Sequence, residues 1–207
     1  FGGILLSSTA GILEKRDSAF FRNFISPTKS AVFLTARYTT DLMVVFVQLL
    51  IFSGISIAFL GPGIFSNPPV FFVLFITASF YILLGIIIGN IFNSEESGIL
   101  FSLIITSVML FFSSTIIPLE NMSETIYNIS RFNPFVLCES MLRKTAVYSL
   151  GINSIWKEAL LILAWIILVI LSIIITDKSG PRKKIENFKG FFNMIVQKLE
   201  KMLFVEE

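Results

Sequence analysis

The sequence predicts an all-α protein, a polytopic bundle of transmembrane helices. Of its 207 residues, 55% are apolar and only 14% are charged, and the mean hydropathy is +0.84. About a quarter of the residues in an ordinary soluble domain are charged, so this composition indicates an integral membrane protein. Four apolar runs are long enough to cross about 30 Å of hydrocarbon, and a shorter apolar run opens the sequence.

The expected membrane segments follow in order along the chain. Residues 1–13 are interpreted as the end of a span, because the run is too short to cross alone and lacks a basic stretch before it. Four full spans are expected at residues 42–60, 70–92, 99–117 and 155–176, the first with an amphipathic lead-in from Lys29. Gly85 and Gly89 form a small-residue pair that lets helices approach closely, and we favour packing within the chain over contact between copies.

The basic residues predict the orientation in the cell membrane. Residues 14–41 and the tail at 177–207 together hold most of the 16 Lys and Arg residues. Because cytoplasmic loops carry the excess of basic residues, we expect residues 14–41, 93–98 and 177–207 in the cytoplasm. The connection at 118–154 is then external; its apolar residues and its breaks at Pro118 and Pro134 predict a region that re-enters the outer leaflet or caps the bundle.

The cytoplasmic tail has apolar residues at alternating spacings of three and four from Ile185 to Met202. This pattern favours an amphipathic helix on the inner leaflet. A seam that packs against a cytoplasmic partner or a second copy is the alternative.

Residues 14–27, EKRDSAFFRNFISP, form a charged amphipathic segment between two apolar runs. On a helix, Phe20, Phe21 and Phe24 share one side with other apolar residues, and basic residues lie largely opposite. An apolar face at a membrane surface either lies in lipid or docks into another protein. The residues alone leave both alternatives open.

Three stretches resemble the C-terminal part of the membrane subunit of ABC-2 type exporters. They are EKRDSAFFRNFISPTKSAVFLTARY at 14–38, NSEESGILFSLI at 93–104 and IIPLENMSETIYNISRFNPFVLCESMLRK at 116–144. Leu137 departs from the Tyr or His often found there in the family. The resemblance covers residues 1–176, ends where the tail begins, and implies that the chain lacks the first of the family's six helices and most of the second.

The resemblance implies a role for several sets of residues. Residues 14–27 would be a coupling helix that sits in a cleft of a nucleotide-binding ATPase subunit, through Glu14, Arg16, Phe20, Phe21, Phe24, Ser26 and Pro27. The route across the membrane would be lined by Ser7, Ser8, Thr9, Ser102, Thr106 and Ser113, although such hydroxyls can also bond back to their own helix. The external motif would comprise Pro118, Glu120, Asn133, Pro134, Glu139 and Arg143.

The function implied is that of an export permease that works with a second permease subunit, while ATP binds to the partner ATPase. The chain has no histidine and no G-x-x-x-x-G-K-[ST] loop, so we expect no cofactor, metal or catalytic site in it. A net charge of +2 predicts no nucleic-acid partner. Spans without a charge near the middle disfavour an ion-coupled carrier. The alternatives are a non-transporting scaffold or regulator and, less favoured, a membrane-embedded lipid-modifying enzyme.

Overall fold

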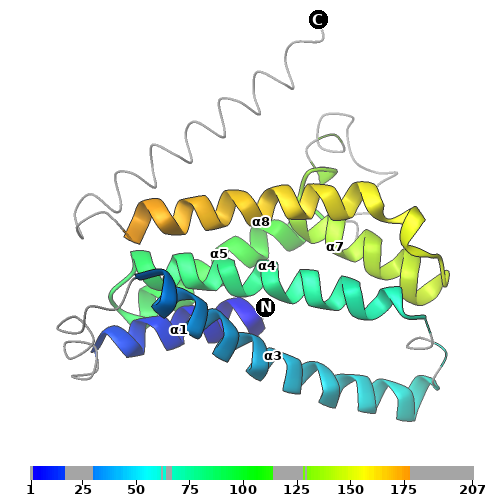
Figure 1. The fold of residues 1–207 in the computed structure, drawn as a ribbon, viewed down its shortest axis with the longest axis horizontal. Helices are drawn as coiled ribbons and strands as arrows, with labels where there is room; N and C mark the ends of the chain where they lie inside the picture. The colour runs from blue at the N-terminus through cyan, green and yellow to red at the C-terminus, as the bar shows by residue number, and fades with distance from the viewer. Residues whose placement is uncertain are drawn as a thin grey trace, which may run out of the picture.

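The computed structural model describes residues 2–16, 30–61, 63, 67–113, 128 and 130–177. Throughout these residues the regular elements are helices, arranged side by side in a bundle (Figure 1). They are α1 (Gly2–Arg16), α3 (Ser30–Leu60), α4 (Pro69–Ile91), α5 (Glu95–Phe111), α7 (Pro134–Leu142), a π-helix η3 (Arg143–Val147), a 3₁₀-helix η4 (Ile152–Ser154) and α8 (Trp156–Asp177).

The two ends of the bundle carry different elements. One end holds the C-termini of α1 and α4 and the N-termini of α3 and α5, and we call it the predicted cytoplasmic end. The opposite end holds the N-termini of α4 and α8 together with η3 and η4, and we call it the predicted external end. The names follow the orientation that the basic residues predict.

Helix α4 is the centre of the bundle. It packs against α1, α3, α5, α7 and α8, and 56% of its apolar window is buried. Its fully buried side chains include Phe80, Ile82 and Ile86, which join a core that also takes in Ile4 of α1 and Met141 of α7. A helix that is apolar on every side is typical of a buried position.

Helix α3 lies at the periphery and diverges from the bundle towards its C-terminus (Figure 1). Only 6% of its apolar window is buried. Such a helix is stable in a bilayer because its backbone groups bond within the helix and its apolar side chains can face lipid. Its candidate span runs from Val32 to Phe59 and therefore includes Arg37 and Asp41, which lie ahead of the span expected at 42–60.

Helices α1 and α4 approach closely at the two glycines of α4. A Cβ atom on Gly85 would lie 2.6 Å from both the carbonyl oxygen of Ile4 and the Cβ atom of Ser7. A Cβ atom on Gly89 would lie 2.9 Å from the carbonyl oxygen of Ser8. These contacts are within one chain, and they bring the backbone of α1 against that of α4.

Helix α5 is shorter than the span expected at 99–117. It begins at Glu95, where the Ser94 side chain accepts a hydrogen bond from the Ser97 amide as an N-cap, and it ends at Phe111. Its 17 residues cover only about 26 Å. Within the described residues, the helices long and apolar enough to span a membrane are Val32–Phe59, Pro69–Ile91 and Trp156–Thr176.

Helix α7 lies within the bundle at the predicted external half, beyond the end of α5 (Figure 1). It packs against α8, α4 and α5, with Leu137 and Met141 buried. The Asn133 side-chain amide donates a 2.7 Å hydrogen bond to the carbonyl oxygen of Met109, near the end of α5. Part of the region expected at 118–154 as external and re-entrant is therefore packed helix.

Candidate functional site

Three helices meet in a partly buried polar junction at the predicted cytoplasmic end, formed by Ser7, Arg37, Asp41 and Asn90. Arg37 Nη2 donates to the carbonyl oxygen of Ser7 at 2.6 Å, and Nη1 donates to Asn90 Oδ1 at 3.4 Å. Ser7 Oγ donates to Asp41 Oδ2 at 2.6 Å, with Ser7 fully buried and Asp41 5% exposed. The junction thus ties α1 to α3 and α3 to α4.

Arg37 and Asp41 are four residues apart in α3, a spacing at which two opposite charges can pair directly. Both side chains instead bond to α1 through Ser7, one to its carbonyl and the other to its hydroxyl. Gly11 makes room for this arrangement, because a Cβ atom there would collide with the guanidinium of Arg37.

Lys15 fastens the end of α1 to the end of α4. Its Nζ donates to the carbonyl oxygens of Gly89 at 2.6 Å, Asn90 at 2.9 Å and Phe92 at 3.3 Å. The last carbonyls of a helix lack amide partners and carry partial negative charge, so an ammonium group is a suitable partner. Lys15 is therefore a C-terminal cap for α4 supplied by another helix.

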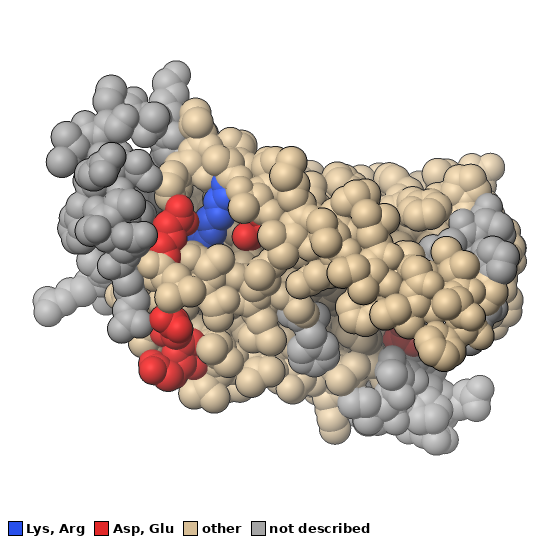
Figure 2. Space-filling view, turned by 90° about the horizontal axis from the view of Figure 1, so that it is seen from below, with Lys and Arg blue, Asp and Glu red and all other residues tan. Residues whose placement is uncertain are grey.

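A cavity of about 450 Å³ lies between α1 and α3 beside the junction. Figure 2 shows, on this face, a blue basic patch set between red acidic ones. Burial raises the pKa of Glu14; the charge of Arg37 opposes that shift and the charge of Asp41 adds to it. The lining residues are Ala10, Leu13, Glu14, Phe33, Ala36, Arg37, Thr40 and Asp41.

The predicted coupling residues divide between described and undescribed parts of the chain. Glu14 and Arg16 lie in the last turn of α1, which continues to Arg16 rather than ending at residue 13. Phe20, Phe21, Phe24, Ser26 and Pro27 lie outside the described residues. Both flanks of residues 17–29, the end of α1 and the start of α3, are helices held by the junction.

The predicted pathway residues are mostly buried inside this chain. Ser7, Ser8, Ser102 and Ser113 are fully buried, Thr106 is 2% exposed, and Thr9 is half-buried. The structure brings Ser102 and Ser8 together, with 3.2 Å between their hydroxyl oxygens.

Except for Ser7, these hydroxyls donate to carbonyls three or four residues earlier in the chain. Such bonds run from Ser8 and Thr9 to Leu5, from Ser102 to Gly98, from Thr106 to Ser102 and from Ser113 to Leu110. In this conformation most of the set is buried within the chain, and Ser8 and Ser102 meet where α1 packs against α5.

The described external-motif residues organise α7. The Asn133 side chain accepts a 3.0 Å bond from the amide of Phe135 as the N-cap, and Pro134 occupies the first turn, where a missing amide hydrogen costs nothing. Glu139 and Arg143 form an ion pair across one turn. Pro118 and Glu120 lie outside the described residues.

Sequence patterns did not assign a role to four polar side chains that the structure places at helix ends. Lys15 is one, and the others are Asn67, Lys144 and Glu158 at the predicted external end. The role of Lys15 could have been suspected from the sequence, because a basic residue at the end of an apolar helix can bind the C-terminus of a neighbouring helix. Asn67 carried a weaker indication, as the polar residue before two prolines.

Comparison with known proteins agrees with this architecture. The family described as "ABC-2 family transporter protein" matches residues 1–176. Searches of curated proteins and of solved structures gave no match. The match covers the whole described bundle except its last residue and leaves the tail outside. The chain therefore belongs to the ABC-2 family of transporter proteins, as a membrane permease of ABC transporters.

Proposed function

We propose that this chain is the permease subunit of an ATP-binding cassette exporter. It forms the translocation path with a second permease subunit, and a separate nucleotide-binding ATPase subunit drives it. The observation that carries the proposal is the polar junction, because it joins both flanks of residues 17–29 to the centre of the bundle.

The junction supplies the mechanical connection that coupling requires. Residues 14–27 would receive the motion of the ATPase, since they resemble the family's coupling helix. Arg37 and Asp41 link the start of α3 to α1, and Lys15 links the end of α1 to α4. Hydrogen bonds to charged groups contribute about 1.5–3 kcal/mol each, so a push on either flank would move α1, α3 and the end of α4 together.

The α1–α5 interface supports a role in opening the path. Its hydroxyls are mostly satisfied by carbonyls of their own helices, so separating the helices would expose few unpaired polar groups. The Ser102–Ser8 bond crosses the interface and would break on separation, at about 1 kcal/mol. The same hydroxyls would then face the gap.

The proposal is tested by purifying the full chain from its native membranes in a mild detergent. We expect an ATPase with a G-x-x-x-x-G-K-[ST] loop to co-purify in equal amount and to hydrolyse ATP in the complex. A permease that stays intact and membrane-derived yet recovers no ATPase would contradict the proposal. Hydrolysis that no transported compound stimulates would favour the scaffold alternative.

A further inference from the structure

A π-helical turn lies at the predicted external end, between α7 and α8. It spans Arg143–Val147, and the amide of Tyr148 donates to the carbonyl oxygen of Arg143, five residues earlier, at 3.2 Å. The amide of Leu150 then donates to the carbonyl oxygen of Lys144 at 3.0 Å. π-Helices account for well under 1% of residues in proteins and occur mostly as single turns, frequently at functional sites.

Asn67, in the connection between α3 and α4, is hydrogen-bonded to this turn and to the residues that follow it. Its Nδ2 donates to the carbonyl oxygen of Thr145 and to that of Leu150, each at 3.0 Å. The turn brings these two carbonyls together, and Ser149, directly before Leu150, has a φ of 49°. That is an uncommon conformation for a residue other than glycine.

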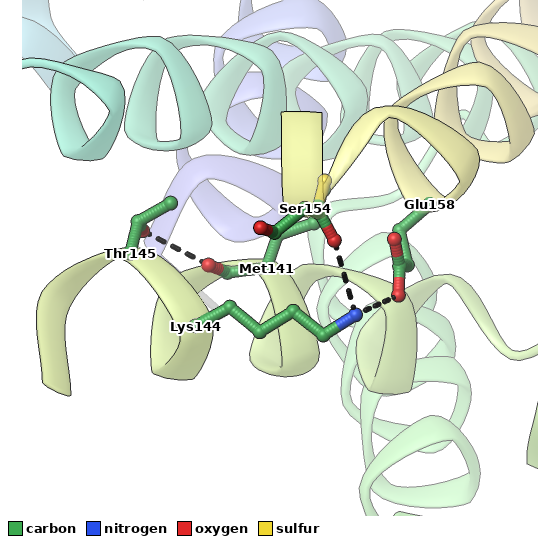
Figure 3. Close-up of polar contacts among 5 residues, drawn as sticks. All are labelled: Met141, Lys144, Thr145, Ser154 and Glu158. Carbon is green, nitrogen blue, oxygen red and sulfur yellow. Dashed lines mark hydrogen bonds and ion pairs between the residues drawn. The ribbon is translucent and has the colours of Figure 1, made fainter. Parts of the chain in front are cut away.

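Two further side chains hold the turn from the other side. Thr145, which is fully buried, donates from Oγ1 to the carbonyl oxygen of Met141 at 2.9 Å. Lys144 Nζ pairs with the Glu158 carboxylate of α8 and donates to the carbonyl oxygen of Ser154, at the end of η4, at 3.3 Å (Figure 3). Side chains therefore fix the turn to the α3–α4 connection, to α7 and to α8, in addition to its own backbone bonds.

We propose that residues 143–155 form a releasable latch between the α3–α4 connection and α8 at the predicted external end, held by the two hydrogen bonds of Asn67. The turn has an alternative, the α-helical register, which differs by one residue and rotates the succeeding residues by about 100°. That rotation would carry the carbonyls of Thr145 and Leu150 away from Asn67. The two registers are discrete arrangements of one segment, as a conformational switch requires.

The latch rests on the proposed function only for its part in transport, and its two states can be tested in the permease alone. Amide hydrogen exchange is measured on the full chain in lipid nanodiscs for wild type, Asn67→Asp and Asn67→Ala. Asn67→Asp keeps the shape of the side chain and removes the donor. Asn153→Ala, at an exposed asparagine of the same connection, is the matched control.

Both Asn67 variants should speed exchange at the amides of Tyr148 and Leu150 on the order of tenfold, because two hydrogen bonds are lost. Asn153→Ala should leave that exchange unchanged. Native exchange in Asn67→Asp would overturn the proposal. Exchange that rises equally along α4 and α8 would also overturn it, because general destabilisation would then explain the result.

A second measurement tests the change of register. Spin labels are placed at Val147 and Lys157, both exposed, in a Cys138→Ala background. Wild type should give one distance, and Asn67→Asp should add a second population. A single unchanged distance in every variant would overturn the latch and would leave the ATPase partnership untouched.

Discussion

The contact between α1 and α4 predicts that Gly85→Ala destabilises the permease. A Cβ atom there would sit 2.6 Å from the Ile4 carbonyl oxygen and 2.6 Å from the Cβ atom of Ser7. Neither atom is the free end of a flexible side chain, so α1 must move away by several tenths of an ångström. Overpacking of this kind costs about 1–3 kcal/mol, against a gain of up to about 1 kcal/mol from replacing glycine in a helix.

Because both contacts lie well inside van der Waals distance, the cost falls in the upper part of that range, about 2–3 kcal/mol. The expected net loss is then about 1–2 kcal/mol, which corresponds to a Tm lower by roughly 2–8 °C for a chain of this size. Thermal unfolding in nanodiscs, followed by tryptophan fluorescence, measures it. Gly54→Ala is the control, since Gly54 lies in α3 with nothing within 4 Å of its Cβ position, and its Tm should stay the same or rise. A Gly85→Ala variant as stable as Gly54→Ala would refute the close packing of α1 on α4.

Three more predictions concern single side chains. Lys15→Met should lower the free energy of unfolding by about 1.5–3 kcal/mol, because the last carbonyls of α4 lose a charged donor; denaturant titration checks this against Lys157→Met. Asn133→Ala should cost about 2 kcal/mol, from the α7 cap and the bond to Met109, and equal stability to wild type would contradict it. Glu14→Gln should raise the Tm at neutral pH, because burial raises the Glu14 pKa and so makes the ionised carboxylate unfavourable in the folded state. This gain in Tm should vanish as the pH falls to the usual carboxyl range, where Glu14 is protonated. A gain in Tm that persists at low pH would argue against this cause.

Hydropathy predicted the buried helices closely because apolar runs with sharp ends define them. Residues 70–92 and 155–176 correspond to Pro69–Ile91 and Trp156–Asp177. Proline begins the first, and in the second Trp156 is followed by the charged Lys157 and Glu158. The amphipathic lead-in before residue 42 is continuous with the span in α3, since Ser30–Leu60 is one helix.

The C-terminal end of α5 differs from the end of the apolar run that predicted the span. The apolar run continues past Phe111 to Ile117, yet α5 ends at Phe111 and the side chain of Asn133, more than twenty residues later, bonds near its end. No local pattern encodes that contact. The expected 99–117 span therefore overestimates the helix.

The polar junction could be located from sequence only in part. Arg37 and Asp41 are four residues apart, and this spacing places both charges on one face of α3. Their partner was not predictable, because Ser7 lies 30 residues before Arg37 in a different helix. A buried charge takes whichever arrangement satisfies most of its hydrogen-bonding groups, and that depends on how α1 meets α3.

The central claim is that residues 14–27 couple the bundle to an ATPase, and the Phe20→Ser, Phe21→Ser, Phe24→Ser triple variant tests it most directly. The measurement is ATP hydrolysis and transport by the purified complex in proteoliposomes. A matched triple replacement of Phe188, Phe191 and Phe192 in the tail, outside the family match, is the control. We predict that the first variant keeps a folded bundle but loses ATP-driven transport, while the tail variant retains it. Normal transport by the first variant would contradict the coupling assignment.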